Sequence, residues 1–125
     1  MTDSLISAAR VAQSRAYAPY SKFRVGAALE SSEGDVYLGC NVENASYGLT
    51  ICAERAAVFA AVSAGVTRFR RAVVVTDVDP PAAPCGACRQ VIAEFATPET
   101  VVWFLRDGKP LSMTMAQLLP AGFAI

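Results

Sequence analysis

The chain has 125 residues, of which 54% are hydrophobic, and its 11 basic and 11 acidic residues leave no formal net charge. The balanced charge argues against a nucleic-acid partner, which would need a basic excess, and no run reaches the roughly 18 apolar residues of a membrane span. The length suggests one domain, 1–125, and the high apolar fraction suggests burial between subunits.

Hydrophobic periodicity and turn residues divide the chain into alternating helices and strands. The first helix has Asp3 or Ser4 as its cap, and its apolar face is formed by Leu5, Ala8, Ala9 and Ala12. The further expected elements are strands at 25–30 and 36–41, a helix at 52–64, a strand at 71–76, a helix at 85–95, strands at 101–105 and 111–115, and a helical turn at 116–119. A proline-rich loop, Pro80 to Pro84, opens the third helix.

This order of elements predicts an α/β fold, a three-layer α/β/α sandwich on a five-stranded mixed sheet. The helices between the middle strands make those crossovers parallel and right-handed. The connection from Leu105 to Leu111, which contains the turn pair Asp107-Gly108, is too short for a crossover. The last two strands should therefore be antiparallel.

Three of the four cysteines form a pattern that suits one zinc ion. Cys85 and Cys88 have the short spacing of two ligands on one metal, and Cys52 opens another predicted helix, where thiolates are stabilised. Because the chain has no histidine, a zinc site would use thiolates or carboxylates. Three sulfur ligands leave a fourth position open for water, as in catalytic sites. For the Cys85/Cys88 pair alone, redox activity is an alternative.

Two neighbours of Cys52 could complete a catalytic site. Glu54 could move protons if the zinc lies in front of the helix start, although a first-turn glutamate can also merely complement the helix dipole. Arg55 could donate hydrogen bonds to the thiolates and offset their charge, or be an ordinary exposed arginine. Cys40 as a fourth ligand would make the site structural, but at a strand end we expect it to pack as a small hydrophobe.

The segments Cys52-Ala53-Glu54 and Pro84-Cys85-Gly86-Ala87-Cys88 resemble the signature of zinc-dependent deaminases. Deaminases that act on polynucleotides or on deoxycytidylate begin this signature with histidine, whereas a cysteine at position 52 resembles the small tetrameric cytidine deaminases. Further matches to that family extend over nearly the whole chain, and they are residues 19–23, 25–27, 39–47, 118–120 and Phe123.

The resemblance implies hydrolytic deamination of free cytidine and deoxycytidine to uridine and deoxyuridine, a step of pyrimidine salvage that releases ammonia. One zinc per subunit would be held by Cys52, Cys85 and Cys88, with Glu54 moving the protons, in a cytoplasmic homotetramer. Blasticidin-S deaminase, similar in size and motif, and a non-catalytic zinc module with four cysteine ligands are the alternatives.

The resemblance also assigns substrate-binding residues. They are Asn41 and Glu43 for the ribose hydroxyls, Phe23 near the base and sugar, the Ala53 backbone for the pyrimidine, Ala45, Ser46 and Tyr47 near a neighbouring subunit's site, and Phe123 over a base bound in a neighbouring subunit. Without the resemblance, Asn41 and Glu43 are polar residues at a strand end, and Phe23 is a core residue.

Overall fold

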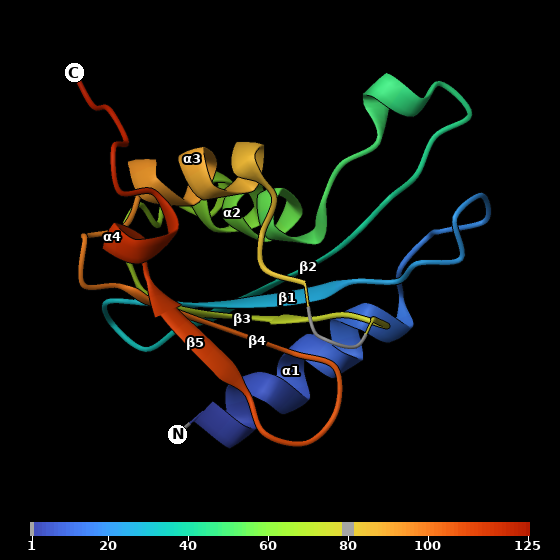
Figure 1. Ribbon diagram of the computed structural model, residues 1–125, viewed down its shortest axis with the longest axis horizontal. Coiled ribbons are helices and arrows are strands. Elements are labelled where there is room, and N and C mark those ends of the chain that lie inside the picture. The colour runs from blue at the N-terminus through green and yellow to red at the C-terminus, as the bar shows by residue number, and fades with distance from the viewer. Residues whose placement is uncertain (1, 79–81) are drawn as a thin grey trace.

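A five-stranded mixed sheet lies between helices on both of its faces in the computed structural model, which describes residues 2–78 and 82–125 (Figure 1). In chain order the elements are α1 Thr2–Ser14, β1 Gly26–Ser31, β2 Val36–Cys40, the 3-10 turn η1 Tyr47–Leu49, α2 Ala53–Ser63, β3 Phe69–Val75, α3 Gly86–Glu94, β4 Val101–Leu105, β5 Leu111–Thr114 and α4 Met115–Leu118. The predicted succession of helices and strands is confirmed. No helix in the described part of the chain has the length and apolar character needed to cross a membrane.

The strands are ordered β2-β1-β3-β4-β5. β1 is antiparallel to both β2 and β3, whereas β3 and β4 are parallel. β2 and β3 therefore point the same way on either side of β1, so the connections through α2 and α3 both join parallel strands, as predicted. β4 and β5 pair antiparallel, with Trp103 opposite Ser112, which confirms the prediction from their short connection.

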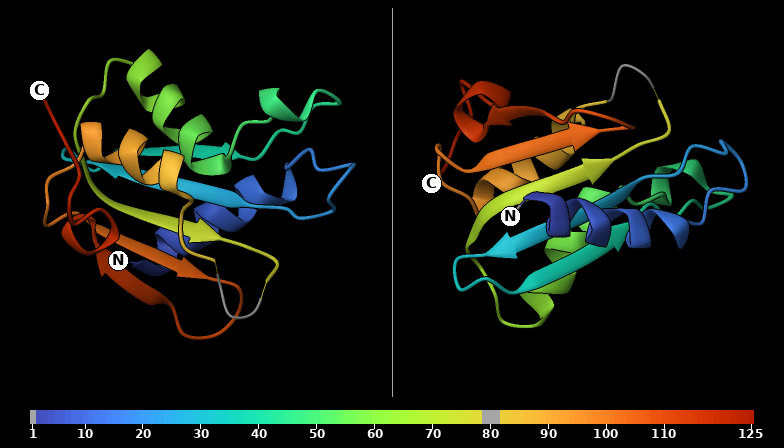
Figure 2. Two further views of the ribbon diagram at one scale, coloured as in Figure 1. Left: turned by 45° about the horizontal axis from the view of Figure 1, so that its top comes forward. Right: turned by 90° about the horizontal axis from the view of Figure 1, so that it is seen from below.

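Each face of the sheet has its own apolar cluster, because successive side chains of a strand point to opposite faces. Val73 and Val75 of β3 pack with Leu5 and Ala9 of α1. Val74, between them in sequence, belongs instead to the larger cluster beneath α2 and α3. Figure 2 shows α1 on one face of the sheet and α2 and α3 together on the opposite face. The predicted three-layer sandwich is therefore correct.

Close contact between α2 and β2 depends on Gly39. A Cβ atom built at this position would collide with the backbone of Ala53 and Ala57, one turn apart on α2. The start of α2 can therefore lie directly on the end of β2 only because residue 39 has no side chain. This contact fixes the helix start that carries the first predicted zinc ligand.

Two details of the expected helices are wrong. α1 already includes Thr2, so Asp3 and Ser4 lie within its first turn and do not cap it; Asp3 still complements the positive end of the helix. The helices expected to start at Cys52 and Cys85 begin one residue later, with these cysteines as N-caps. Of the predicted proline-rich loop, residues 80 and 81 lie outside the described residues.

Candidate functional site

Three cysteine sulfurs meet where α2 and α3 begin. The Sγ atoms of Cys52, Cys85 and Cys88 all lie within 4.8 Å of one another, with 4.0 Å between Cys52 and Cys85 and 3.3 Å between Cys85 and Cys88. Zn–S bonds of about 2.3 Å in a tetrahedral arrangement separate two sulfurs by about 3.8 Å. The cluster therefore has the size that one zinc ion requires. In the described part of the chain, Cys40 is not a member of this cluster.

The helix starts explain why these sulfurs converge. Cys52 and Cys85 are the N-caps of α2 and α3, and both have extended backbone conformations. Cys88 follows in the first turn of α3, where its N–H lies 3.5 Å from Cys85 Sγ. The sulfurs therefore lie at two positive helix ends, and at α3 a free N–H group points to Cys85, which favours thiolates.

The charge on the sulfurs calls for a cation. A hydrogen bond from Cys88, supported by Arg55, lowers the pKa of the Cys52 thiol. The same hydrogen bond and burial raise the pKa of Cys88, because a second negative charge beside the Cys52 thiolate is unfavourable. A divalent cation would remove this conflict and allow all three thiols to ionise. The donor set therefore fits zinc.

Arg55 supplies positive charge beside the cluster. Its Nη2 donates a hydrogen bond to Cys52 Sγ at 3.3 Å, the contact expected if it offsets thiolate charge. Its Nε is buried and has no hydrogen-bond partner among the described residues. A buried donor normally has a partner, so the site has hydrogen-bonding capacity that the chain by itself leaves unused.

Glu54 is buried beside the first ligand. Only 6% of its surface is exposed, and burial, with a smaller contribution from the Cys52 charge, raises the pKa of Glu54 to about 7. A nearby zinc ion would oppose this rise. A carboxyl group that changes protonation near neutral pH can both accept and donate a proton. A glutamate that only complements the helix dipole would not need this property.

Asn41, one of the two residues predicted to bind the sugar, lies next to the helix start that carries Cys52. Val42 and Ile51 form an isolated antiparallel bridge, so the preceding Asn41 and the following Cys52 lie at the same end of this pair. Asn41 is buried; its Oδ1 accepts from Val25 N at 2.9 Å, and its Nδ2 donates to Phe23 O at 2.7 Å. The amide therefore holds the chain around Phe23 and keeps one donor and one acceptor position for a ligand.

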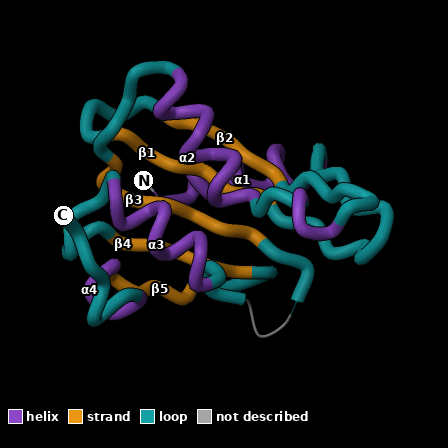
Figure 3. The backbone as a smooth tube through the Cα atoms, turned by 90° about the horizontal axis from the view of Figure 1, so that it is seen from above, coloured by secondary structure: helices purple, strands orange, loops and turns teal. Residues whose placement is uncertain are grey.

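Two loops extend beyond the sheet on the side where α2 begins. They are the segment between α1 and β1 and the segment between β2 and α2 (Figures 1 and 3). Ala45, Ser46 and Tyr47 lie in the second loop and are exposed, Tyr47 by 75%. The Tyr47 ring meets the Tyr20 ring edge-on at 5.9 Å, and a cavity of about 260 Å³ between the loops is lined by Tyr20, Ser21, Glu43, Tyr47 and Thr50.

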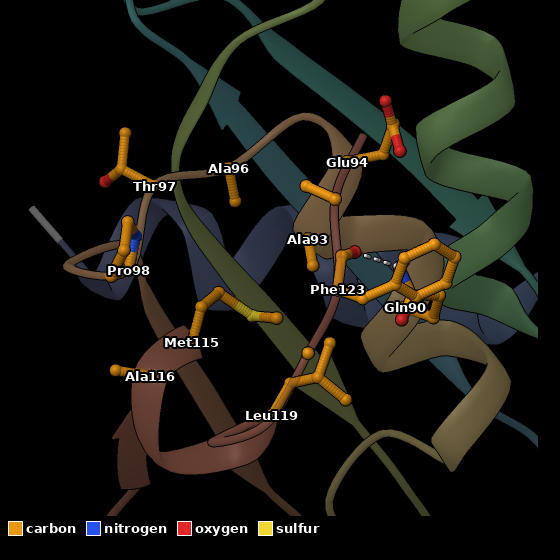
Figure 4. A pocket seen from close by; sticks show the side chains of 12 residues that line it. Gln90, Ala93, Glu94, Ala96, Thr97, Pro98, Met115, Ala116, Leu119 and Phe123 are labelled. Atoms are coloured by element: carbon orange, nitrogen blue, oxygen red, sulfur yellow. Dashed lines mark hydrogen bonds between the residues drawn. The ribbon is translucent and has the colours of Figure 1, made fainter.

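Phe123 lies apart from the cysteines within one chain. It lines a cavity of about 290 Å³ formed by α3, α4 and the C-terminal segment, with Met115, Leu119 and Gln90 among the other lining residues (Figure 4). Gln90 Nε2 donates to the Phe123 carbonyl at 3.4 Å, while 72% of Phe123 is exposed. None of the three cysteines lines this cavity.

The sequence reasoning missed two residues that organise the site. Arg89 donates through Nε to Pro84 O at 2.7 Å and through Nη1 to Leu118 O at 3.0 Å, so it ties the turn before Cys85 to the end of α4. Ser21 connects the loop before β1 to Glu43. Both stand within or beside the motifs, but their partners are distant in sequence, and only the fold reveals them.

Comparison with known proteins agrees with this geometry. Residues 1–104 match the family model of the cytidine and deoxycytidylate deaminase zinc-binding region. A curated cytidine deaminase of Sporosarcina psychrophila is 49% identical over 98% of this chain and 90% of its own length, and one of Halalkalibacterium halodurans is 48% identical over 95% and 91%. The crystal structure of cytidine deaminase from Burkholderia pseudomallei superposes with a TM-score of 0.94 at 48% identity, covering 98% of this chain and 99% of that one. The corresponding Mycobacterium tuberculosis structure has a TM-score of 0.86 at 40% identity, covering 99% and 98%.

Proposed function

We propose that this chain, which belongs to the cytidine deaminase family, forms a single domain over 1–125 and hydrolyses the C4 amino group of cytidine and deoxycytidine. The products are uridine or deoxyuridine and ammonia. The observation that carries this proposal is the convergence of Cys52, Cys85 and Cys88 around a volume that suits one zinc ion. The buried carboxyl group of Glu54 lies at the start of α2, beside Cys52.

The proposed reaction assigns the proton transfers to Glu54. When bound, the zinc supplies Lewis acidity that makes a water molecule nucleophilic at neutral pH. Glu54 accepts a proton from that water and delivers it to N3 of the pyrimidine, which makes C4 electrophilic. The water oxygen bonds to C4, and Glu54 carries the second proton to the amino nitrogen. The C4–N bond then breaks and ammonia leaves, so one water is consumed for each ammonia released.

The other residues would bind and orient the nucleoside. Asn41 and Glu43 are proposed to hydrogen-bond the sugar hydroxyls, and Phe23 to pack against the base and sugar. The Ala53 backbone, fully buried at the start of α2, would help hold the pyrimidine ring. Arg55 would act on the sulfurs only, through its hydrogen bond to Cys52.

We further propose a homotetramer in which neighbouring subunits complete each site. In the single chain, Tyr47, Leu49, Phe59 and Phe123 are exposed by 75%, 66%, 48% and 72%, which is a large apolar area for a protein of this length. Phe123, and the loop that contains Ala45, Ser46 and Tyr47, would approach a neighbour's substrate. The free thiols of the chain favour the reducing cytoplasm as its location.

Ammonia release by the purified protein tests the activity. The panel comprises cytidine, deoxycytidine, cytidine monophosphate, blasticidin S and a cytosine-containing single-stranded oligonucleotide. Turnover of the two free nucleosides supports the proposal, and turnover of blasticidin S alone supports the alternative deaminase. The proposal would be rejected if zinc-loaded protein released no ammonia from any cytosine nucleoside.

A further inference from the structure

Ser21 lies in the loop between α1 and β1, and its hydroxyl contacts two residues proposed to bind substrate. It donates a hydrogen bond to Glu43 Oε2 and accepts one from the Phe23 N–H at 3.0 Å. One oxygen atom therefore joins the carboxylate proposed for the sugar to the residue proposed to pack beside the base and sugar.

The Glu43 carboxylate has little free hydrogen-bonding capacity. Oε1 accepts from the backbone N–H groups of Tyr20 at 2.9 Å and Ser21 at 3.2 Å, and Oε2 accepts from the Ser21 hydroxyl. An ionised carboxylate offers about four acceptor positions, so these three bonds leave one, on Oε2. The Ser21 hydrogen bond, foremost among them, lowers the pKa of Glu43, which keeps the group a pure acceptor. A sugar hydroxyl is a donor that fits the remaining position.

The backbone next to Ser21 adopts a strained conformation at Lys22, and the Ser21 hydroxyl stabilises it by binding the N–H group of Phe23. Lys22 has a φ of 62°, in the left-handed region that residues with a side chain rarely adopt. Its N–H donates to Ala18 O at 3.0 Å, and the next N–H, that of Phe23, is turned back onto Ser21 Oγ. Such conformations persist where the surroundings enforce them, and they concentrate at functional sites.

Phe23 is consequently held at both ends of its backbone. Its N–H is bound by Ser21, and its carbonyl accepts the hydrogen bond from Asn41 Nδ2. Three of the residues proposed to meet the nucleoside, Phe23, Asn41 and Glu43, thus form one unit joined by hydrogen bonds through Ser21. Ser21 is the member that connects Glu43 to the other two.

We propose that Ser21 is a positioning residue for the sugar of the nucleoside: its hydroxyl orients the Glu43 carboxylate so that one acceptor on Oε2 remains for a sugar hydroxyl. This inference rests on the proposed function, and it deepens it by assigning recognition of the sugar to a hydrogen-bond relay. Ser21 touches neither the metal ligands nor Glu54, so it acts on substrate binding and leaves the proton transfers alone.

A purely structural role for Ser21 makes a different prediction. If the hydroxyl only shaped the loop, its loss would lower stability or impair every substrate to the same degree. If it acts through Glu43, its loss must matter only when the substrate has a sugar hydroxyl to bind. The sugar of the substrate therefore separates the two readings.

The experiment compares Ser21→Ala with Ser21→Thr, which keeps a hydroxyl, and with Ser14→Ala. Ser14 is a matched control, since it is also exposed and makes a local hydrogen bond, to Val11 O at 2.6 Å. Values of kcat and KM are measured for cytidine and for 2′,3′-dideoxycytidine, which lacks both secondary hydroxyls, together with Tm. Ser21→Ala is also combined with Glu43→Gln in a double-mutant cycle.

We expect Ser21→Ala to raise KM for cytidine about 10-fold, as loss of a hydrogen bond to a charged group does, with kcat and Tm nearly unchanged. Its kcat/KM for dideoxycytidine should stay within about twofold of the unmodified protein, Ser21→Thr should recover most of the loss, and the double variant should be little worse than Glu43→Gln. Equal losses on both substrates, additive losses in the cycle, or a Ser21→Ala enzyme identical to Ser14→Ala would overturn the inference while leaving the proposed function intact. Absence of cytidine turnover by the unmodified protein would reject both the inference about Ser21 and the proposed function.

Discussion

Replacing Glu54 with glutamine tests the assignment of both proton transfers to one side chain. The amide is nearly isosteric with the carboxyl group, so it should fit the same buried position, which is only 6% exposed. It cannot accept and release a proton, whereas the carboxyl group of Glu54, whose pKa is raised by burial, can do both. The change therefore removes the chemistry and keeps the packing.

The magnitude follows from the number of steps affected. Loss of one general acid–base catalyst lowers the rate by about 10²–10⁴-fold, which corresponds to about 2.7–5.5 kcal/mol in the activation barrier. Because Glu54 is proposed to move two protons, we expect kcat to fall by about 10⁴-fold or more. The Tm should not decrease, since the neutral amide avoids the cost of burying an ionised carboxylate.

Three measurements on the same preparation decide the outcome. They are ammonia release from cytidine, zinc content by elemental analysis, and Tm. Glu33→Gln is the matched control, because Glu33 lies exposed in the turn between β1 and β2 and its loss should change none of the three. A Glu54→Gln enzyme that binds a full complement of zinc and keeps more than about a tenth of normal turnover would refute the assignment.

Three further predictions concern the metal, the sheet and the subunits. Cys85→Ala should lose zinc and lower Tm, because a metal bound only by the folded state stabilises it, whereas Cys40→Ala should bind zinc normally; the reverse pattern in elemental analysis would contradict the ligand set. Hydrogen bonds from Arg71 and Arg70 lower the pKa of Glu30 from 4.5 to about 2. The Glu30→Gln variant should therefore have an unfolding free energy at pH 7 that is lower by about 1–2 kcal/mol, after allowance for solvent screening. Since the pKa of Glu30 is lower in the folded state than in the unfolded state, this stabilisation is present above about pH 4.5 and disappears toward pH 2. Urea unfolding of both proteins measures the difference in unfolding free energy, and a difference that grows on acidification would disprove the prediction. Mixing the inactive variants Glu54→Gln and Phe123→Ala under conditions of subunit exchange should restore activity beyond the sum of the parents, and no gain despite demonstrated exchange, or a monomer by light scattering, would rule out Phe123 acting in trans.

The fold was predictable because its signals are local. The run Val73-Val74-Val75 marks β3, Asp107-Gly108 marks the β4–β5 turn, and the short connection there determines an antiparallel pair. The zinc ligands were predictable for a similar reason, since their spacing and their positions at helix starts stand in short segments. The cap of α1 was predicted wrongly, because the helix already includes Thr2, ahead of the polar residues expected to cap it.

Long-range partners were beyond the sequence. Arg70 and Arg71 both bind Glu30 on the neighbouring strand, at 2.7 and 2.6 Å, and no local sequence pattern indicates this pairing. That pairing depends on the register of β1 against β3, which includes an irregularity after Glu30. The link from Ser21 to Glu43 likewise depends on how two loops meet.

The metal centre joins segments that the chain itself keeps apart. Cys52 and Cys85 are separated by 33 residues, and a single ion bound to both closes the intervening loop, which contains α2 and β3. Because the ion is bound only by the folded chain, it stabilises the fold through its binding free energy and does not restrict the unfolded chain as a disulfide does. Unlike a disulfide, this cross-link does not depend on oxidation and is removed by a chelator. Zinc supply would therefore set the lifetime of the folded protein as well as its turnover.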